Sequence, residues 1–178
     1  MRIVSGVYKG KRLYPGKNFR ARPTTDFAKE NLFNVLSNYF NFEELEVLDL
    51  FSGTGSISYE FASRGCLSVD SVESNTRYHT FIQKTASDLS FTQLAAIRAD
   101  AFRFLKHITR DYDLIFADPP FDLKELDHIP HIIFSRNLLK RGGWFILEHG
   151  RDHDFSANTQ FRELRKYGNV HFSIFENR

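Results

Sequence analysis

Short apolar runs alternate with amphipathic stretches along most of the chain, and this alternation is its main structural signal. Apolar runs predict buried strands, whereas apolar residues spaced three and four apart predict helices. Strands are expected at 47–50, 67–72, 94–98, 114–117 and 144–147. Helices are expected at 26–40, from the glycine-rich turn to Arg64, at 76–89, at 101–109 and around 126–139, where Gly142-Gly143 ends the last one. Strands that alternate with helices favour right-handed crossovers and a parallel sheet.

The two ends of the chain depart from this alternation. Residues 2–5 and 7–14, around Gly6, are rich in β-forming residues and predict a small N-terminal β-hairpin. Residues 161–167 and 170–175, separated by Gly168-Asn169, predict an antiparallel hairpin at the C-terminal end. The expected fold class is therefore α/β, with a mostly parallel seven-stranded sheet. We expect residues 1–24 to form an extension and 25–178 to form the main domain.

Composition restricts the class of protein. A chain of 178 residues, of which 42% are hydrophobic, suits one folded domain, and no apolar run is long enough to span a membrane. Cys66 is the only cysteine, so an internal disulfide and zinc fingers are excluded and a reducing cytoplasm is expected. His128 and His131, like His149 and His153, have helical spacings but belong to no metal motif, and we expect them at the surface.

Positive charge is concentrated at the start of the chain. The formal net charge is only +2, yet residues 1–22 contain seven basic side chains and no acidic one. They are Arg2, Lys9, Lys11, Arg12, Lys17, Arg20 and Arg22. The remaining residues carry 17 basic and 22 acidic side chains. A basic segment on an acidic body favours a polyanionic partner such as nucleic acid, the alternative being a solvated tail.

A loop of small residues follows the first expected strand. Asp49 ends that strand, and Gly53 and Gly55 allow a tight turn and a close approach of a ligand to the backbone. The dinucleotide-binding fingerprint fails because Ser58 stands where its third glycine belongs, and the chain contains no P-loop motif. The loop therefore favours a nucleoside ligand without a phosphate site.

Acidic residues end successive strands of the expected sheet. Glu73 ends the second strand, where a carboxylate commonly accepts hydrogen bonds from ribose hydroxyls. Asp100 follows the third strand and is placed to face an adenine amino group, and Asp49 lies near the other end of such a ligand. Each acid alone could be a helix cap or a surface group. Together they favour a crevice that binds S-adenosylmethionine.

The tetrapeptide Asp118-Pro119-Pro120-Phe121 follows the fourth strand. Two prolines remove two backbone donors and fix the chain, so this segment presents only hydrogen-bond acceptors beside an aromatic ring. Such a site suits a planar group that carries an amine, because the acceptors bind its hydrogens and the ring stacks on its face. The simpler alternative is a strand end followed by a proline turn.

These motifs resemble those of a known family. VLDLFSGTG at 47–55, VESN at 72–75, DA at 100–101 and DPPF at 118–121 resemble class I S-adenosylmethionine-dependent amino-methyltransferases, which have a Rossmann-like fold. RIVSG at 2–6, GKRL at 10–13, RPTTD at 22–26 and ENLFN at 30–34 are similar to the bacterial 16S rRNA guanine-N2 methyltransferases. The resemblance covers nearly the whole chain. It implies methyl transfer to the N2 amine of guanine 966 in 16S rRNA, within a small-subunit assembly intermediate, by a cytoplasmic monomer.

The resemblance also assigns roles to residues. Asp118 and Pro119 are expected to accept the hydrogens of the amine and Phe121 to stack on the base. The cofactor is expected to contact Asp49, Phe51, Gly53, Gly55, Glu73, Ser74, Asp100 and Ala101. RNA is expected to contact Arg2, Lys9, Lys11, Arg12, Arg22 and Thr24. The resemblance implies no metal. Glu148, at the end of the fifth strand, is either structural or part of the acceptor cleft.

The sequence is also compatible with other functions. A DNA adenine or cytosine methylase shares the Asp-Pro-Pro-Phe motif but usually needs a separate target-recognition domain. A protein-glutamine methylase usually has Asn before Pro-Pro-Tyr, and Asp118 and Phe121 depart from that pattern. A catalytically silent rRNA-binding assembly factor is the alternative from a different class, and the intact cofactor loop argues against it.

Overall fold

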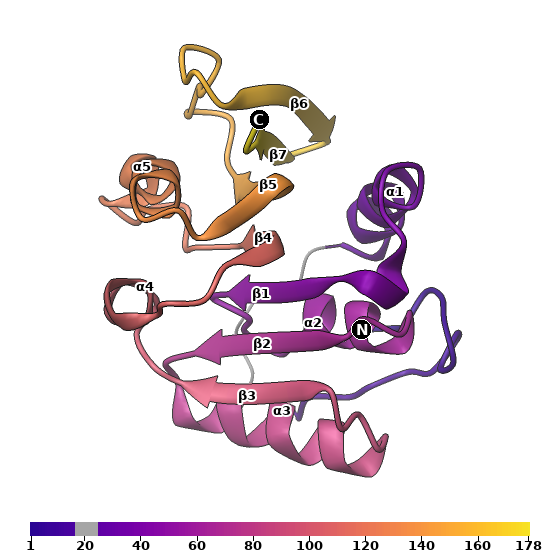
Figure 1. Ribbon diagram of the computed structural model, residues 1–178. Coiled ribbons are helices and arrows are strands. Elements are labelled where there is room, and N and C mark those ends of the chain that lie inside the picture. Colours follow the sequence, from indigo (N-terminus) through magenta and orange to yellow (C-terminus); the bar gives the residue numbers. More distant parts are fainter. Residues whose placement is uncertain (17–24) are drawn as a thin grey trace.

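A computed structural model describes residues 1–16 and 25–178 of the chain. Its centre is a seven-stranded sheet with the strand order β3-β2-β1-β4-β5-β7-β6 (Figure 1). The strands are β1 (Glu46–Leu50), β2 (Ser68–Glu73), β3 (Leu94–Arg98), β4 (Tyr112–Ala117), β5 (Leu139–His149), β6 (Phe161–Tyr167) and β7 (Val170–Glu176). The helices are α1 (Asp26–Leu36), α2 (Ser56–Ser63), α3 (Thr76–Asp88), α4 (Ala101–His107) and α5 (Ile129–Ser135), with short 3-10 turns η1 (Phe42–Glu44) and η2 (Leu126–His128).

The expected fold class is confirmed. Strands β1 to β5 pair in parallel, whereas β7 is antiparallel to both β5 and β6. Apolar residues cover both faces of the sheet. One core cluster joins it to α1, α2 and α3, and includes Leu32, Phe61 and Ile82. The other joins it to α4 and α5, and includes Leu105 and Ile133. Burial on both faces explains why the central strands are nearly continuous apolar runs.

The expected helix around 126–139 is wrong at its C-terminal end. Helix α5 ends at Ser135, and β5 already begins at Leu139 and continues through Gly142 and Gly143. The register of β4 against β5 shifts between Tyr112 and Leu114, which marks an irregular, bulged stretch of the pair. Glycine within a strand commonly marks such a bulge, so the two glycines interrupt the apolar pattern without ending an element.

The expected N-terminal β-hairpin is reduced to one isolated antiparallel bridge, between Arg2 and Arg12. Three amides bond across the expected pair, those of Ile3, Gly10 and Leu13, but the ladder is not regular because other amides bond helix α2. The amides of Val4 and Ser5 donate to the Glu60 carboxylate at 2.8 and 3.0 Å, and the amide of Val7 donates to the Ser63 carbonyl at 2.8 Å.

Close contact with α2 also explains the glycine at position 6. Gly6 has a φ of +79°, and a Cβ atom added there would lie 1.8 Å from the Ser63 carbonyl oxygen. Ile3 and Leu13 are buried in the same core cluster as α1 and α2. Residues 1–16 therefore pack as an ordered layer against α2, with their basic side chains Arg2, Lys9, Lys11 and Arg12 exposed.

Candidate functional site

A cavity of about 530 Å³ opens at the carboxyl ends of the parallel strands. The strand order reverses between β1 and β4, so the connections that follow these two strands run to opposite faces of the sheet and leave a crevice between them. Segments after β1, β2, β3, β4 and β5 contribute to its lining, as do Thr25 and the turn between β6 and β7. The expected cofactor residues other than Gly55, and the tetrapeptide 118–121, all line this one cavity.

The loop after β1 forms one wall. Phe51 has a φ of +58°, which is unusual for a bulky residue, and the Ser52 amide and hydroxyl both bond the Val72 carbonyl, at 3.0 and 3.2 Å. Gly55 is not among the residues that line the cavity, so its expected cofactor contact stays a prediction. It has a φ of +80° at the start of α2, and a Cβ atom there would lie 2.8 Å from the Tyr59 ring. Its role is to shape the loop.

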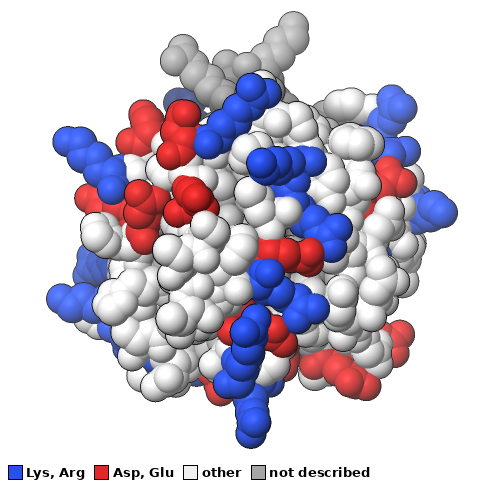
Figure 2. Space-filling view, turned by 90° about the horizontal axis from the view of Figure 1, so that it is seen from above, with Lys and Arg blue, Asp and Glu red and all other residues white. Residues whose placement is uncertain are grey.

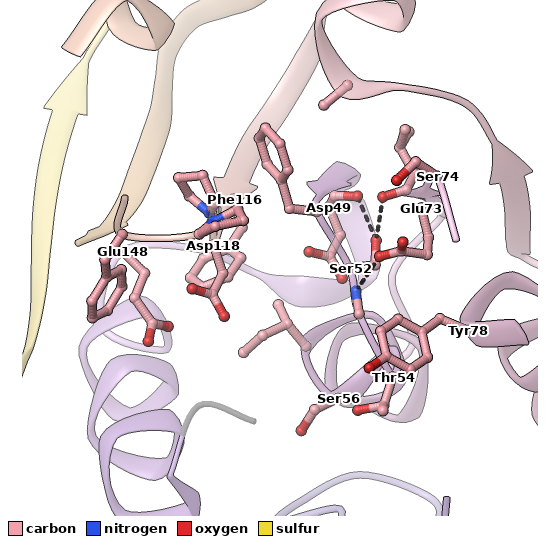
Figure 3. A pocket seen from close by; sticks show the side chains of 18 of the residues that line it. Asp49, Ser52, Thr54, Ser56, Glu73, Ser74, Tyr78, Phe116, Asp118 and Glu148 are labelled. Atoms are coloured by element: carbon pink, nitrogen blue, oxygen red, sulfur yellow. Dashed lines mark hydrogen bonds between the residues drawn. The ribbon is translucent and has the colours of Figure 1, made fainter. Parts of the chain in front are cut away.

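Glu73 is held rigidly at the end of β2. One carboxylate oxygen accepts a hydrogen bond from the Gly53 amide at 2.8 Å, and the other accepts from the Asn75 amide at 2.7 Å. Each carboxylate oxygen has two lone pairs, so both can still accept a hydrogen bond from the cavity. Ser74 and Tyr78 line the cavity beside it (Figure 3). This arrangement fits the pair of hydroxyls of a ribose.

Asp49 lies at the floor of the cavity and is only 1% exposed. Its carboxylate accepts a short hydrogen bond from the Ser58 hydroxyl. Burial raises the pKa of Asp49 to about 7, although the bond from Ser58 acts in the opposite direction. Near neutral pH, this carboxyl group therefore exists in both protonation states.

Asp100 and Ala101 line the cavity on the side of β3. Asp100 is exposed and also caps helix α4, because its carboxylate accepts a hydrogen bond from the Arg103 amide at 2.9 Å. The residue thus combines the two roles that the sequence left open, a helix cap and a wall of the crevice. Its second carboxylate oxygen can accept a hydrogen bond from a ligand.

The segment 118–121 forms the opposite end of the cavity. Asp118 directly follows β4, and its amide bonds the Leu50 carbonyl at 3.3 Å. Its pKa is raised well above the usual range of a carboxyl group, first by burial and then by the negative charges of Glu148 and Asp49. Phe121 is 43% exposed, and its ring lies against Gly150, where an added Cβ atom would approach the ring to 3.3 Å.

Some cavity residues were not identified from the sequence. Glu148, left open there, lines the cavity and is only 3% exposed. Thr25, Tyr78 and Asn169 also line it. Thr25 is also the N-cap of α1, a role in which its hydroxyl accepts from the Ala28 amide at 3.1 Å. Tyr78 and Asn169 belong to no motif, since only the folded arrangement brings them to this edge of the sheet.

The expected RNA-contacting residues divide into two groups. Arg2, Lys9, Lys11 and Arg12 are exposed on the layer formed by residues 1–16, whereas Arg22 and Thr24 lie outside the described residues. Arg2 is within 3.9 Å of Asp26 and 3.8 Å of Glu30 on helix α1. The Met1 sulfur lies 3.7 Å from the hydroxyl of Thr54, which lines the cavity. The basic layer therefore borders the site.

Two of the four histidines expected at the surface are not exposed: His149 is buried and His153 is half-buried. His149 is fully buried rather than on the surface, and its ring nitrogens bond the Gly150 carbonyl at 2.7 Å and the Ser173 hydroxyl at 2.8 Å. His128 and His131 are exposed, as expected. Within residues 1–16 and 25–178, no cluster of ligating side chains could hold a metal ion, and no helix could cross a membrane.

Comparisons with known proteins agree with this geometry. The family model "Conserved hypothetical protein 95" matches residues 1–176. A ribosomal RNA small subunit methyltransferase D from Buchnera aphidicola is 31% identical over 99% of this chain and 92% of its own length.

Solved structures show the same fold. A putative methyltransferase from Escherichia coli superimposes with a TM-score of 0.87 over 100% of this chain and 98% of its own, at 24% identity. The Thermus thermophilus 16S rRNA N2 G1207 methyltransferase, solved in complex with AdoMet and guanosine, has a TM-score of 0.70 and 21% identity, and the match covers 89% of this chain and 45% of that one.

The match over nearly the full length, together with a relative above 30% identity, establishes the family. The chain belongs to the Conserved hypothetical protein 95 family of class I S-adenosylmethionine-dependent methyltransferases, whose members include ribosomal RNA small subunit methyltransferase D.

Proposed function

We propose that this methyltransferase transfers a methyl group to the N2 amine of a guanine in 16S rRNA, namely guanine 966. The observation that carries the proposal is the position of Asp118 and Pro119 at one end of a cavity whose other end suits an adenosine. The name of the relative from Buchnera supports a small-subunit rRNA substrate, and the resemblance of the N-terminal motifs supports the N2 amine of guanine.

The cofactor half of the cavity fits S-adenosylmethionine. Glu73, fixed by two backbone amides, would accept hydrogen bonds from both ribose hydroxyls. Asp100 would accept from the adenine amino group, Phe51 would border the adenosine, and Asp49 would face the amino-acid end. When bound, S-adenosylmethionine supplies a methyl group on a positively charged sulfur, which the acids around the cavity stabilise.

The acceptor half holds and orients the amine. The lone pair of the guanine N2 atom is delocalised into the ring, so the amine is a poor nucleophile. Acceptance of its two hydrogens by the Asp118 carboxylate and the Pro119 carbonyl would hold the nitrogen toward tetrahedral geometry and direct its lone pair into the cavity. Phe121, partly exposed at the rim, would stack on the base. Such positioning can contribute about 7–11 kcal/mol to catalysis.

Asp118 would also receive a proton. As N2 forms its bond to the methyl carbon, the bond from that carbon to the sulfur would break and its electron pair would stay on the sulfur, which becomes uncharged. The nitrogen would then carry the positive charge and one hydrogen too many. The raised pKa of Asp118 makes it a better proton acceptor than an ordinary carboxylate. The proton passes from N2 to the carboxylate and from there to water, which restores the site.

The basic layer at the N-terminus would hold the RNA backbone. Arg2, Lys9, Lys11 and Arg12 are exposed beside the cavity, and Arg22 and Thr24 are proposed as further contacts on the basis of the sequence. The target guanine must leave its stack to reach Asp118, which costs a few kcal/mol and less in a loop. A small-subunit assembly intermediate would present such a loop.

A transfer assay tests the proposal. The protein is mixed with labelled S-adenosylmethionine and with small subunits or 16S rRNA that lack the modification, and the product is mapped by mass spectrometry. Label is expected on the N2 atom of one guanine, and the map decides between position 966 and any other.

Two variants, one in the site and one outside it, test the role of Asp118 in transfer. Asp118→Ala should reduce transfer by about 10²-fold or more, because it removes both acceptor and proton sink. Asp152→Asn, which changes an exposed carboxylate on the loop after β5, should leave transfer unchanged. Near wild-type transfer by Asp118→Ala would exclude the role assigned to this side chain. If the wild-type protein labels no guanine, the proposed reaction is excluded.

A further inference from the structure

Glu148 occupies the position on β5 that corresponds to Asp118 on β4. Phe116 pairs with Ile146 and Ala117 pairs with Leu147, so Asp118 and Glu148 each follow the last paired residue of neighbouring parallel strands. Residues two apart on a strand share a face, and neighbouring strands lie about 4.8 Å apart. Both acids are therefore adjacent on the face of the sheet that carries Phe116 and Ile146.

Both carboxyl groups reach the acceptor end of the cavity. Asp118 and Glu148 line it together, and Figure 3 shows their side chains side by side and directed the same way, away from Glu73 and Ser74. Glu148 is only 3% exposed, and its charge is among the causes that raise the pKa of Asp118. Two adjacent carboxyl groups that line one end of a cavity present hydrogen-bond acceptors to a ligand that carries adjacent donors.

Guanine has a donor edge that matches two adjacent carboxylates. Its N1–H and its N2 amine lie next to each other on the Watson–Crick edge. We propose that Glu148 accepts the N1–H of the target guanine while Asp118 accepts from the N2 amine, so that Glu148 is the residue that selects guanine; this inference rests on the proposed function.

Adenine would be excluded by the same pair. Its N1 atom is an acceptor without a hydrogen, so it cannot donate to a carboxylate and its lone pair would face the negative charge. Sites built to bond a particular donor reject analogues that lack it far more strongly than sites that only fit a shape. Glu148 thus supplies chemical selection, whereas Phe121 stacks on any base.

The analogue 2-aminopurine tests this assignment, because it keeps the 2-amine but has no N1–H. The substrates are small subunits reconstituted with 16S rRNA that carries either guanine or 2-aminopurine at the mapped position. The measured quantity is the ratio of kcat/KM for guanine to that for 2-aminopurine. The wild-type protein should prefer guanine at least 100-fold, and Glu148→Gln should reduce this ratio at least tenfold, because the glutamine amide can donate to the bare N1 atom.

A binding measurement and a control variant complete the test. The ratio of the Kd values for the two substrates is measured with the same proteins, so that Glu148→Gln remains informative even if its turnover is slow. Asp70→Asn removes a buried carboxylate that does not line the cavity and should keep the wild-type ratio. If the wild type methylates guanine but Glu148→Gln keeps the wild-type ratios, the role of Glu148 is wrong. If the wild type does not methylate guanine at all, the proposed function itself fails.

Discussion

At the scale of single residues, the site is defined by carboxyl groups that burial makes reluctant to ionise. The pKa of Asp49 is raised to about 7, and that of Asp118 is also raised, in both cases first by burial. Each raised pKa means that the folded protein binds a proton more tightly than the unfolded chain does. The stability that these bound protons contribute is fully present at pH values below the pKa of the unfolded chain. It is lost as the pH rises to the pKa of the folded state.

Asp49→Asn should therefore change the pH dependence of stability. Between pH 3.8 and about 7, this carboxyl group is ionised in the unfolded chain but still protonated in the folded protein, so the free energy of unfolding of the wild type falls as the pH rises. Asparagine carries no charge at any pH, so the variant should gain stability relative to wild type between pH 5 and pH 8, by about 1–3 kcal/mol. Urea unfolding at several pH values measures this difference. A difference that stays constant across the range would contradict a raised pKa at this residue.

Asp118 should set the acid limb of the pH–rate profile. Only its ionised form can take the proton from the amine, so kcat/KM should rise with pH through a value above the usual carboxyl range. Glu148 and Asp49 are the charged neighbours that contribute to this shift. Glu148→Gln removes one of the two charges and should move the limb to lower pH. A limb that stays in place would mean that the charge of Glu148 does not act on Asp118.

At the scale of elements, one buried acid on α2 joins the N-terminal layer to the rest of the fold. Glu60 is fully buried, accepts from the Val4 and Ser5 amides, and lies 3.0 Å from Arg64 and 3.9 Å from Lys29. The Lys29 ammonium also donates to the Arg2 carbonyl at 2.5 Å and to the hydroxyl of Ser56, a cavity residue, at 3.2 Å. Glu60 and Lys29 thus link the basic layer to the wall of the site.

Glu60→Gln should loosen this layer. It removes the buried carboxylate beside the Lys29 ammonium and leaves only the half-exposed Asp26, 4.0 Å away, as its acidic partner. Breaking a buried pair in this way costs up to about 3–5 kcal/mol. We expect lower stability in urea and faster amide exchange over residues 1–16, followed by mass spectrometry. Asp88→Asn is the control, because the Lys84–Asp88 pair of α3 is largely exposed and contributes about 0–1 kcal/mol. Equal exchange rates in Glu60→Gln and wild type would show that Glu60 does not anchor the layer.

The sequence predicts elements well where one periodicity dominates. The strand 94–98 and the hairpin at 161–175 follow directly from their apolar alternation, and the observed bounds agree within one residue. The start of β5 was missed because Gly142 and Gly143 lie in a bulge whose existence depends on pairing with β4. The N-terminal strands were wrong for a similar reason, since their backbone amides bond Glu60, 55 or more residues away.

The residues of the site also differ in whether a local sequence pattern indicates them. Asp49, Glu73, Asp100 and Asp118 could be found because each ends or follows a recognisable strand, and parallel strands bring their carboxyl ends together. Tyr78 and Asn169 lie within a helix and a hairpin turn, where no local pattern indicates a cavity. The motif around Gly55 indicates a tight turn, and the close approach of the Tyr59 ring gives a second reason for glycine that the sequence does not reveal.

At the scale of the whole molecule, exposed basic side chains differ in whether they form ion pairs with carboxylates. Seen from above in Figure 2, Lys and Arg side chains form a band across a face that includes the edge strand β6, with acidic groups among and beside them. Arginines of β6 are paired internally: Arg162 is 2.8 Å from Glu176, and Arg165 is 2.7 Å from Glu163. Within the described part of the chain, Lys9, Lys11 and Arg12 have no carboxylate within ion-pair distance. The basic side chains of the N-terminal layer are therefore more available to phosphate groups than the ion-paired arginines of β6.

This difference predicts the salt dependence of RNA binding. Each phosphate neutralised by a lysine or arginine releases counterions, and the slope of log K against log salt falls by about 0.7–0.9 for each contact that is lost. Replacing Lys9, Lys11 and Arg12 with alanine should therefore weaken RNA binding and flatten the slope by about 2–3, as measured by filter binding between 50 and 200 mM salt. The control replaces Lys84, Lys106 and Arg141, which are exposed on α3, α4 and β5, and removes the same charge elsewhere. A slope that the N-terminal variant leaves unchanged would mean that RNA does not bind this layer. Equal flattening by both variants would mean that RNA responds to the net charge of the protein and not to this layer.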